Sequence, residues 1–156
     1  MRGSGCAVCM GEDIDTDLVI AGRYLRTKDR SVWVEHVFED LDPSLAPLLD
    51  GLVIVAGKNF GCGSSREQAA IAIREAGVAA VVAPSFARIF FRNAINVGLL
   101  LIECNITCSE GSLVTFDLSE GWVEAEGKKW STHPLSPKIH AILSAGGLVE
   151  YWRNQR

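Results

Sequence analysis

The residues best suited to chemistry form one short run, Gly63-Ser64-Ser65-Arg66, at the end of a glycine-rich stretch. A strand-like apolar run at residues 52–56 precedes this stretch, and helix formers at residues 67–76 follow it. A glycine-rich turn between a buried strand and a helix start gathers unpaired backbone N–H groups and the positive end of the helix dipole. We therefore expect an anion site at this turn.

The two serines of the run can serve as helix caps or as ligands. Ser64 lies three residues before Glu67, and Ser65 lies three before Gln68, so either can form a capping box. Only one residue can be the N-cap, which leaves the other hydroxyl free to face the anion site. In the alternative, both serines only cap and Arg66 is solvated. Because a guanidinium matches a carboxylate bidentately, the composition favours a carboxylate pocket.

Other chemistries fit the run poorly. Lys58 precedes the glycines, whereas a Walker loop ends in Gly-Lys-Ser/Thr, and Gly61-Cys62-Gly63 lacks the third glycine of a dinucleotide fingerprint. The three histidines lie in no recognisable motif, and there is no Gly-x-Ser-x-Gly elbow. The sequence therefore disfavours nucleotide binding and serine-hydrolase chemistry.

Four of the five cysteines, Cys6, Cys9, Cys104 and Cys108, have roughly the spacing of a four-thiolate zinc or cluster site. Both pairs, however, lie in apolar, strand-like stretches rather than in glycine-rich knuckles, and free cysteine is commonly buried. We expect this chain to hold no metal itself. The redox state and any pairing of the cysteines stay open.

The composition is that of one soluble domain spanning residues 1–156, with 48 % hydrophobic and 22 % charged residues. The net charge is −4 and the basic residues form no stripe, so we expect no nucleic-acid partner. No apolar run is long enough to cross a membrane, and the first residues lack an apolar signal region. The expected compartment is the cytoplasm.

The elements that must position the run form a strand–helix–strand–helix–strand pattern with short connections. Such a pattern implies right-handed crossovers and a mostly parallel central sheet, so the expected fold class is α/β. The expected elements are strands at 52–56, 78–83 and 99–102, and helices at 67–76 and 84–96.

The flanking regions are less regular. Residues 31–49 have helical composition but are interrupted by Pro43 and Pro47. Near the C-terminus the patterns predict four elements: a hairpin of strands at 113–118 and 122–125, a helix at 137–145 and a final strand at 148–151.

The stretch from Gly61 to Glu67 resembles the signature of the aconitase swivelling domain. This domain occurs free as the small subunit of 3-isopropylmalate dehydratase and of homoaconitase. The Asp-Ile-Asp-Thr-Asp motif at residues 13–17 is also similar to that family, as are residues 85–100 and the ending at 145–149. The resemblance therefore spans nearly the whole chain.

The resemblance implies a swivelling β/β/α domain that docks on a large subunit carrying a 4Fe-4S cluster. It implies that Ser64 is the catalytic base, that Ser65 and Arg66 hold a substrate carboxylate, and that Asp17 belongs to the active site. The implied reaction isomerises a small di- or tricarboxylic hydroxy acid by dehydration and rehydration. The expected substrate is isopropylmalate, as in leucine biosynthesis.

The resemblance also places Arg26 in a loop that contacts the part of the substrate that differs between pathways. An apolar loop suits an isopropyl group, whereas an arginine suits the distal carboxylate of homocitrate or homoaconitate. In the alternative, Arg26 is a solvated surface charge. Isopropylmalate and homoaconitate therefore both stay open, as do dimethylmalate, maleate and a non-catalytic role in binding an anion or a partner. The oligomeric state without the large subunit is not readable from the sequence.

Overall fold

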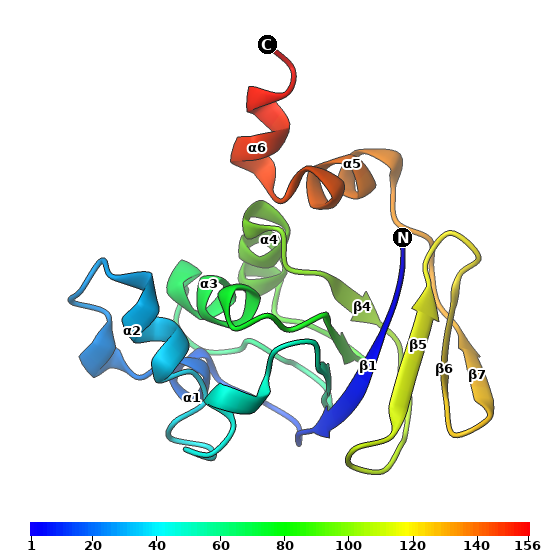
Figure 1. Cartoon of the computed structure of the whole chain (residues 1–156), viewed down its shortest axis with the longest axis horizontal. Coiled ribbons are helices and arrows are strands. Elements are labelled where there is room, and N and C mark those ends of the chain that lie inside the picture. The colour runs from blue at the N-terminus through cyan, green and yellow to red at the C-terminus, as the bar shows by residue number, and fades with distance from the viewer.

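A computed structural model describes the whole chain, residues 1–156. One seven-stranded sheet runs through the molecule in the order β4-β3-β2-β1-β5-β6-β7 (Figure 1). Its strands are β1 (Arg2–Cys9), β2 (Val53–Val55), β3 (Ala80–Ala83), β4 (Leu101–Glu103), β5 (Leu113–Asp117), β6 (Trp122–Ala125) and β7 (Lys128–Ser131). The helices are α1 (Thr16–Val19), α2 (Arg30–Glu35), α3 (Glu67–Glu75), α4 (Arg88–Val97), α5 (Pro137–Ala145) and α6 (Leu148–Arg153).

Strands β1 to β4 pair in parallel and form one half of the sheet. Their apolar side chains alternate between two hydrophobic clusters, one on each face: Ile54 and Val81 enter the first, whereas Val53 and Val82 enter the second. Covering both faces explains why these strands are continuous apolar runs rather than alternating ones. The predicted strand–helix–strand–helix–strand order is confirmed.

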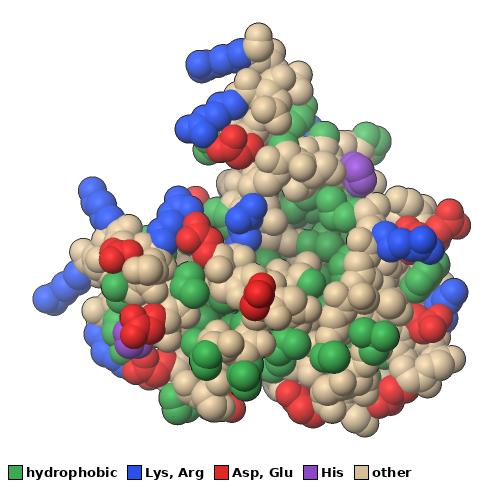
Figure 2. Space-filling view, in the orientation of Figure 1, with side chains coloured by type: hydrophobic (Ala, Val, Ile, Leu, Met, Phe, Trp, Pro, Cys, Tyr) green, Lys and Arg blue, Asp and Glu red, His purple; other side chains and the backbone are tan.

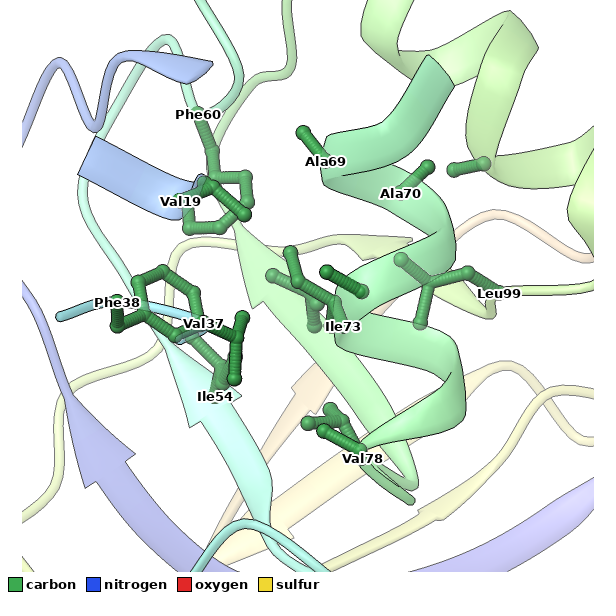
Figure 3. Packing of buried hydrophobic residues seen from close by; sticks show 14 of the residues in the cluster. Val19, Val37, Phe38, Ile54, Phe60, Ala69, Ala70, Ile73, Val78 and Leu99 are labelled. Carbon is green, nitrogen blue, oxygen red and sulfur yellow. The ribbon is translucent and has the colours of Figure 1, made fainter. Parts of the chain in front are cut away.

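Helix α3 covers one face of the parallel half. Figure 3 shows Ala69, Ala70 and Ile73 of α3 in the same cluster as Ile54 of β2, with Phe60 nearby. Small side chains on the inner face of the helix let it approach the sheet closely. This packing fixes the start of α3 relative to the carboxyl end of β2.

Strands β5, β6 and β7 form an antiparallel meander that continues the sheet from the other edge of β1. The predicted hairpin corresponds to β5 and β6. The third strand, β7, was not predicted because Lys128, Lys129 and Ser131 are exposed on this edge strand and give no apolar pattern. Its polar composition is typical of an edge strand.

The predicted final strand at 148–151 is wrong, because these residues begin helix α6. Gly146 and Gly147 both have positive φ and end α5, after which the chain turns and starts a new helix. Leu148 and Tyr151, three residues apart, pack against the second cluster, as helical spacing allows. In Figure 1, α6 projects from the body of the molecule.

One further prediction needs correction, and one is confirmed. The second crossover helix begins at Arg88 rather than near Pro84, because Phe86 forms a parallel bridge with Phe60 before the chain turns into α4. Only parts of residues 31–49 are helical, namely α2 and a 3-10 turn, Ala46–Leu48, which agrees with the interruption expected from the two prolines.

Two further findings concern the charges on the surface and the character of the helices. Basic and acidic side chains are interspersed on the face shown in Figure 2, with Lys and Arg over α6, over α2 and near the β5–β7 edge. No helix in the structure combines the length and apolar character needed to span a bilayer.

Candidate active site

The loop that joins β2 to α3 bends sharply because two of its glycines have left-handed backbone conformations. The φ angles are +83° at Gly61 and +88° at Gly63. A Cβ on Gly61 would lie 2.2 Å from the Phe90 ring, and a Cβ on Gly63 would lie 2.4 Å from the Asp15 carboxylate. Both positions therefore require glycine for conformation and for space. Contacts with α4 and with the start of α1 give the loop its shape.

Residues at the start of α1 contact the backbone of this loop and hold it in place. Asp15 is the N-cap of α1, and its carboxylate lies against Gly63. Thr16 donates its hydroxyl to the Ser64 carbonyl at 2.8 Å, and its N–H to the Cys62 carbonyl at 2.8 Å. Thr16 itself is buried, at 2 % exposure, whereas Ser64 is exposed. The loop is thus anchored to a segment far away in the sequence.

Arg66 is braced from the same side. Its Nη2 lies 2.8 Å from Asp17 Oδ1, and its Nη1 donates to the Ile20 carbonyl at 3.1 Å. The Arg66 side chain is 18 % exposed, whereas that of Asp17 is 59 % exposed. A guanidinium has five N–H donors, so these two contacts leave others for a ligand. In this position Asp17 orients the guanidinium.

The capping boxes expected of Ser64 and Ser65 do not form. The N-cap of α3 is Arg66, in an extended conformation, and no side chain caps the helix. The physical reason is that α1 holds Gly63 and the Ser64 carbonyl, so both serines lie before the first turn. The first N–H groups of α3 are left without a side-chain acceptor, beside two exposed serines. Such uncapped N–H groups favour an anion.

A pocket of about 290 Å³ opens where the loop meets α1 and the start of α4. Three of the predicted site residues, Ser64, Ser65 and Arg66, line it together. Asp17 does not line it but contacts Arg66. The full lining is Thr16, Gly61, Gly63, Ser64, Ser65, Arg66, Ala87, Arg88, Ile89, Phe90 and Asn93.

Sequence reasoning missed Thr16, Arg88 and Asn93 as pocket residues. A signal for the two α4 residues was present: α4 follows β3, the sheet neighbour of β2, so both helices start at the carboxyl edge of adjacent parallel strands, where ligands usually bind. Thr16 lies in the motif at residues 13–17, but nothing local placed it in the pocket, because its contact joins residues 48 positions apart.

Arg26 lies outside this pocket in the isolated chain. It is exposed and follows a 3-10 turn, Gly22–Tyr24, that passes close to the pocket arginine. A Cβ on Gly22 would lie 3.8 Å from Arg66 Nη2. The segment that carries Arg26 therefore borders the pocket without closing it.

The 3-10 turn beside Arg66 is held firmly through Tyr24. The Trp33 indole N–H donates to the Tyr24 carbonyl at 3.0 Å, and the Tyr24 hydroxyl donates to Glu39 at 2.8 Å. The Tyr24 ring also stacks on His36, with ring centroids 4.0 Å apart. The hydrogen bond from the Tyr24 hydroxyl, with a second contact from His36, lowers the pKa of Glu39. These contacts favour an ionised Glu39.

The cysteines do not form the four-thiolate arrangement that their spacing suggested. Cys104 and Cys108 lie in the loop after β4 rather than in a strand, because strand pairing ends at Glu103. Cys9 Sγ–H donates to the Cys108 carbonyl at 3.5 Å, and burial together with the Cys108 thiol raises the pKa of Cys9 to about 12. All five cysteines are free thiols, and no group of three or more Cys, His, Asp or Glu residues could hold a metal ion.

Comparison with known proteins identifies the family of this fold and loop. The sequence profile of the Aconitase C-terminal domain matches residues 13–106. The chain belongs to the aconitase C-terminal domain family. The matched region contains α1, the glycine-rich loop and the start of α4, so every element that lines the pocket lies inside it.

Relatives in the aconitase C-terminal domain family cover nearly the full length of the chain. A 3-isopropylmalate dehydratase small subunit from Halothermothrix orenii is 46 % identical, over 96 % of this chain and 94 % of the relative. A methanogen homoaconitase small subunit from Methanothermobacter thermautotrophicus is 45 % identical, over 91 % and 85 %. The crystal structure of 3-isopropylmalate dehydratase from Methanocaldococcus jannaschii matches with a TM-score of 0.93 at 44 % identity, over 99 % and 95 %. The predicted α/β fold of the swivelling domain is confirmed.

Proposed function

We propose that this chain is the small subunit of a two-component hydro-lyase that interconverts 2- and 3-isopropylmalate by dehydration and rehydration in the cytoplasm. The observation that carries the proposal is the braced loop. Two exposed serines and a mostly buried arginine line one pocket at the uncapped start of α3. A carboxylate fits this arrangement, because the Arg66 guanidinium lines the pocket and the uncapped start of α3 follows it directly in the chain.

In this proposal Ser64 is the catalytic base. Dehydration removes a proton from the carbon beside a carboxylate, and the electron pair of that C–H bond forms the double bond as the hydroxyl departs from the next carbon. A serine hydroxyl is a weak base in water. At an uncapped helix start beside a guanidinium its anion is stabilised, which lowers its pKa. In the rehydration, the Ser64 hydroxyl gives a proton to the carbon that lost the hydroxyl, and water adds to the carbon that lost its proton, so that the hydroxyl ends on the neighbouring carbon.

Ser65 and Arg66 would hold the carboxylate next to the carbon that loses its proton. The guanidinium offsets negative charge that grows on this carboxylate in the transition state. Asp17 would act through Arg66, since its carboxylate is paired with the guanidinium at 2.8 Å. A fixed guanidinium need not reorganise during the reaction, which is the condition for strong electrostatic stabilisation.

The cluster implied by the family would be carried by the large subunit. The residues of this chain do not fit it, because no three metal-binding side chains converge and the pocket side chains are mainly hydroxyl, guanidinium and amide groups. On the partner subunit, such a cluster would supply Lewis-acid chemistry. This chain would contribute the base and the carboxylate clamp.

The proposal is tested by reconstituting the chain with its cognate large subunit and measuring isopropylmalate turnover. We expect Ser64→Ala to lower kcat about 100- to 10,000-fold, the range that a positioned general base contributes. Ser119→Ala is the matched control, because Ser119 lies in the turn between β5 and β6 and its hydroxyl accepts a hydrogen bond from the N-terminal amine, away from the pocket. Full activity of Ser64→Ala would contradict the catalytic role and favour a non-catalytic binding domain.

Homoaconitate is a second candidate substrate, and Arg26 favours it. The Arg26 side chain is exposed and makes no ion pair within the chain, while its segment borders the pocket arginine. We expect Arg26→Val to shift the kcat/KM ratio of the reconstituted enzyme at least about tenfold from homoaconitate toward isopropylmalate, since the distal carboxylate of homoaconitate loses a charge-assisted contact. An unchanged ratio would remove Arg26 from the specificity argument. Turnover of neither acid, but of dimethylmalate or maleate, would assign another diacid.

A further inference from the structure

A buried hydroxyl lies directly behind the proposed base. Thr16 is 2 % exposed, and its Oγ1–H donates to the Ser64 carbonyl at 2.8 Å. The residue is also the first of helix α1, where its N–H donates to the Cys62 carbonyl at 2.8 Å. Thr16 thus holds the backbone on both sides of Gly63, whose Cα lies against the Asp15 carboxylate.

These contacts determine where the Ser64 side chain points. The Ser64 carbonyl belongs to the peptide that also carries the Ser65 N–H, so fixing its direction fixes the plane of that peptide. On the other side, Gly63 has a φ of +88° that the packing of Asp15 maintains. The peptide after Ser64 is held by Thr16, and Gly63 before it is fixed in conformation, so Ser64 has less freedom to change direction than an unanchored loop residue. The side chain is exposed to the pocket while its backbone is anchored.

We propose that Thr16 is a positioning residue for the reaction: its hydroxyl holds the Ser64 carbonyl so that the Ser64 hydroxyl is directed at the substrate carbon. This inference rests on the proposed function, in which Ser64 is the base. Arg66 is held separately, by Asp17 and by the Ile20 carbonyl. Loss of the Thr16 hydroxyl should therefore affect proton transfer far more than carboxylate binding.

The test uses the reconstituted complex of small and large subunits. Thr16→Val keeps the shape of the side chain and removes the donor, so we expect kcat to fall about 10- to 100-fold with KM within about threefold, because a small misplacement of a reacting group costs up to about 100-fold in rate. Thr16→Ser keeps the hydroxyl and should restore kcat to within about threefold of the wild type. Thr16→Cys, with its weaker S–H donor, should fall between these two.

Thr132→Val is the matched control. Thr132 also donates its hydroxyl to a carbonyl, that of Glu103 at 3.0 Å, but does so outside the candidate active site. We expect wild-type kcat for this variant. Thermal unfolding of each isolated small subunit gives the stability change separately.

Three results would overturn the positioning role. They are wild-type kcat for Thr16→Val, failure of Thr16→Ser to restore kcat, or a KM increase as large as the loss of kcat. If Thr16→Val does not fold, the order of kcat among wild type, Thr16→Ser and Thr16→Cys decides the same question. Ser64→Ala keeps this test separate from the proposed function: an active Ser64→Ala enzyme refutes Ser64 as the base, whereas an inactive one combined with a fully active Thr16→Val refutes only the role of Thr16.

Discussion

The two halves of the sheet differ in whether a side chain accepts hydrogen bonds from the backbone N–H groups that follow a strand. In the antiparallel half, the turn after β5 is capped by Asp117, which accepts from the N–H groups of Ser119 and Glu120 at 3.0 and 3.1 Å. Asp117 is buried and also pairs with Arg2 at 3.2 Å. In the parallel half, the start of α3 has no side-chain cap.

This difference locates the function within one continuous sheet. The turn after β5 satisfies two of its N–H donors internally, so these two offer nothing to a ligand. In the parallel half, polar side chains of the α1 segment hold the loop, and the start of α3 stays without a side-chain cap next to the pocket that Ser64 and Ser65 line. Binding capacity therefore lies where the fold leaves donors unused.

The comparison is tested most strongly at two glycines that share a backbone conformation. Gly63 has φ +88° and would place a Cβ 2.4 Å from Asp15, whereas Gly127, between β6 and β7, has φ +76° with nothing within 4 Å. We expect Gly63→Ala to lower kcat/KM of the reconstituted enzyme at least about 100-fold, because the loop must move. Gly127→Ala should cost about 1–2 kcal/mol of stability and leave kcat/KM unchanged. Equal effects of the two substitutions on kcat/KM would contradict the claim that activity depends on the loop conformation at Gly63.

The antiparallel half should respond in stability rather than in activity. Asp117→Ala removes the acceptor for two turn N–H groups and the partner of Arg2. We expect a loss of about 1.5–3 kcal/mol in the free energy of unfolding, the usual contribution of hydrogen bonds to a charged group, with kcat unchanged. Urea unfolding and reconstituted turnover measure the two quantities. Asp117→Asn retains an acceptor oxygen and should lose less stability. A large loss of kcat in either variant would contradict the claim that the antiparallel half affects stability and not activity.

The smallest effect concerns the polar cluster beside the pocket and depends on pH. The bond from the Tyr24 hydroxyl, with the His36 contact, lowers the pKa of Glu39 below its ordinary value of 4.5. Ionised Glu39 therefore stabilises the fold above about pH 4.5, and this contribution is lost as pH falls through the lowered pKa. Glu39→Gln should lower the unfolding temperature at pH 7, but not at a pH below the lowered pKa of Glu39. Glu35→Gln, exposed on α2, is the control and should show no such pH dependence.

The parallel core could be predicted from sequence because its signals are local. Continuous apolar runs indicated β2, β3 and β4, and helix formers ending in glycine indicated α3 and α4. The glycine-rich turn before α3 also indicated the anion site. The family resemblance added roles for Ser64, Ser65 and Arg66, which remain proposals.

The remaining features depend on contacts between distant residues. The capping prediction failed because Thr16 fixes the Ser64 carbonyl, and no spacing within the loop encodes that contact. The pairing of Asp17 with Arg66 is equally distant in sequence. Residues 148–151, predicted as a strand, lie in α6. A short apolar run fits the side-chain periodicity of a strand and that of a helix, and two glycines after α5 change the direction of the chain.

The central place of β1 has a consequence for the order of events during synthesis. β1 pairs with β2 on one edge and with β5 on the other, so it joins the two halves of the sheet. It leaves the ribosome before either partner, and at roughly 5–20 residues per second the roughly 100 residues before β5 take about 5–20 s. During that interval its backbone has open edges, which are prone to pair with other chains. The composition of its first half, Arg-Gly-Ser-Gly, has low strand propensity and so limits premature pairing until the correct partners exist.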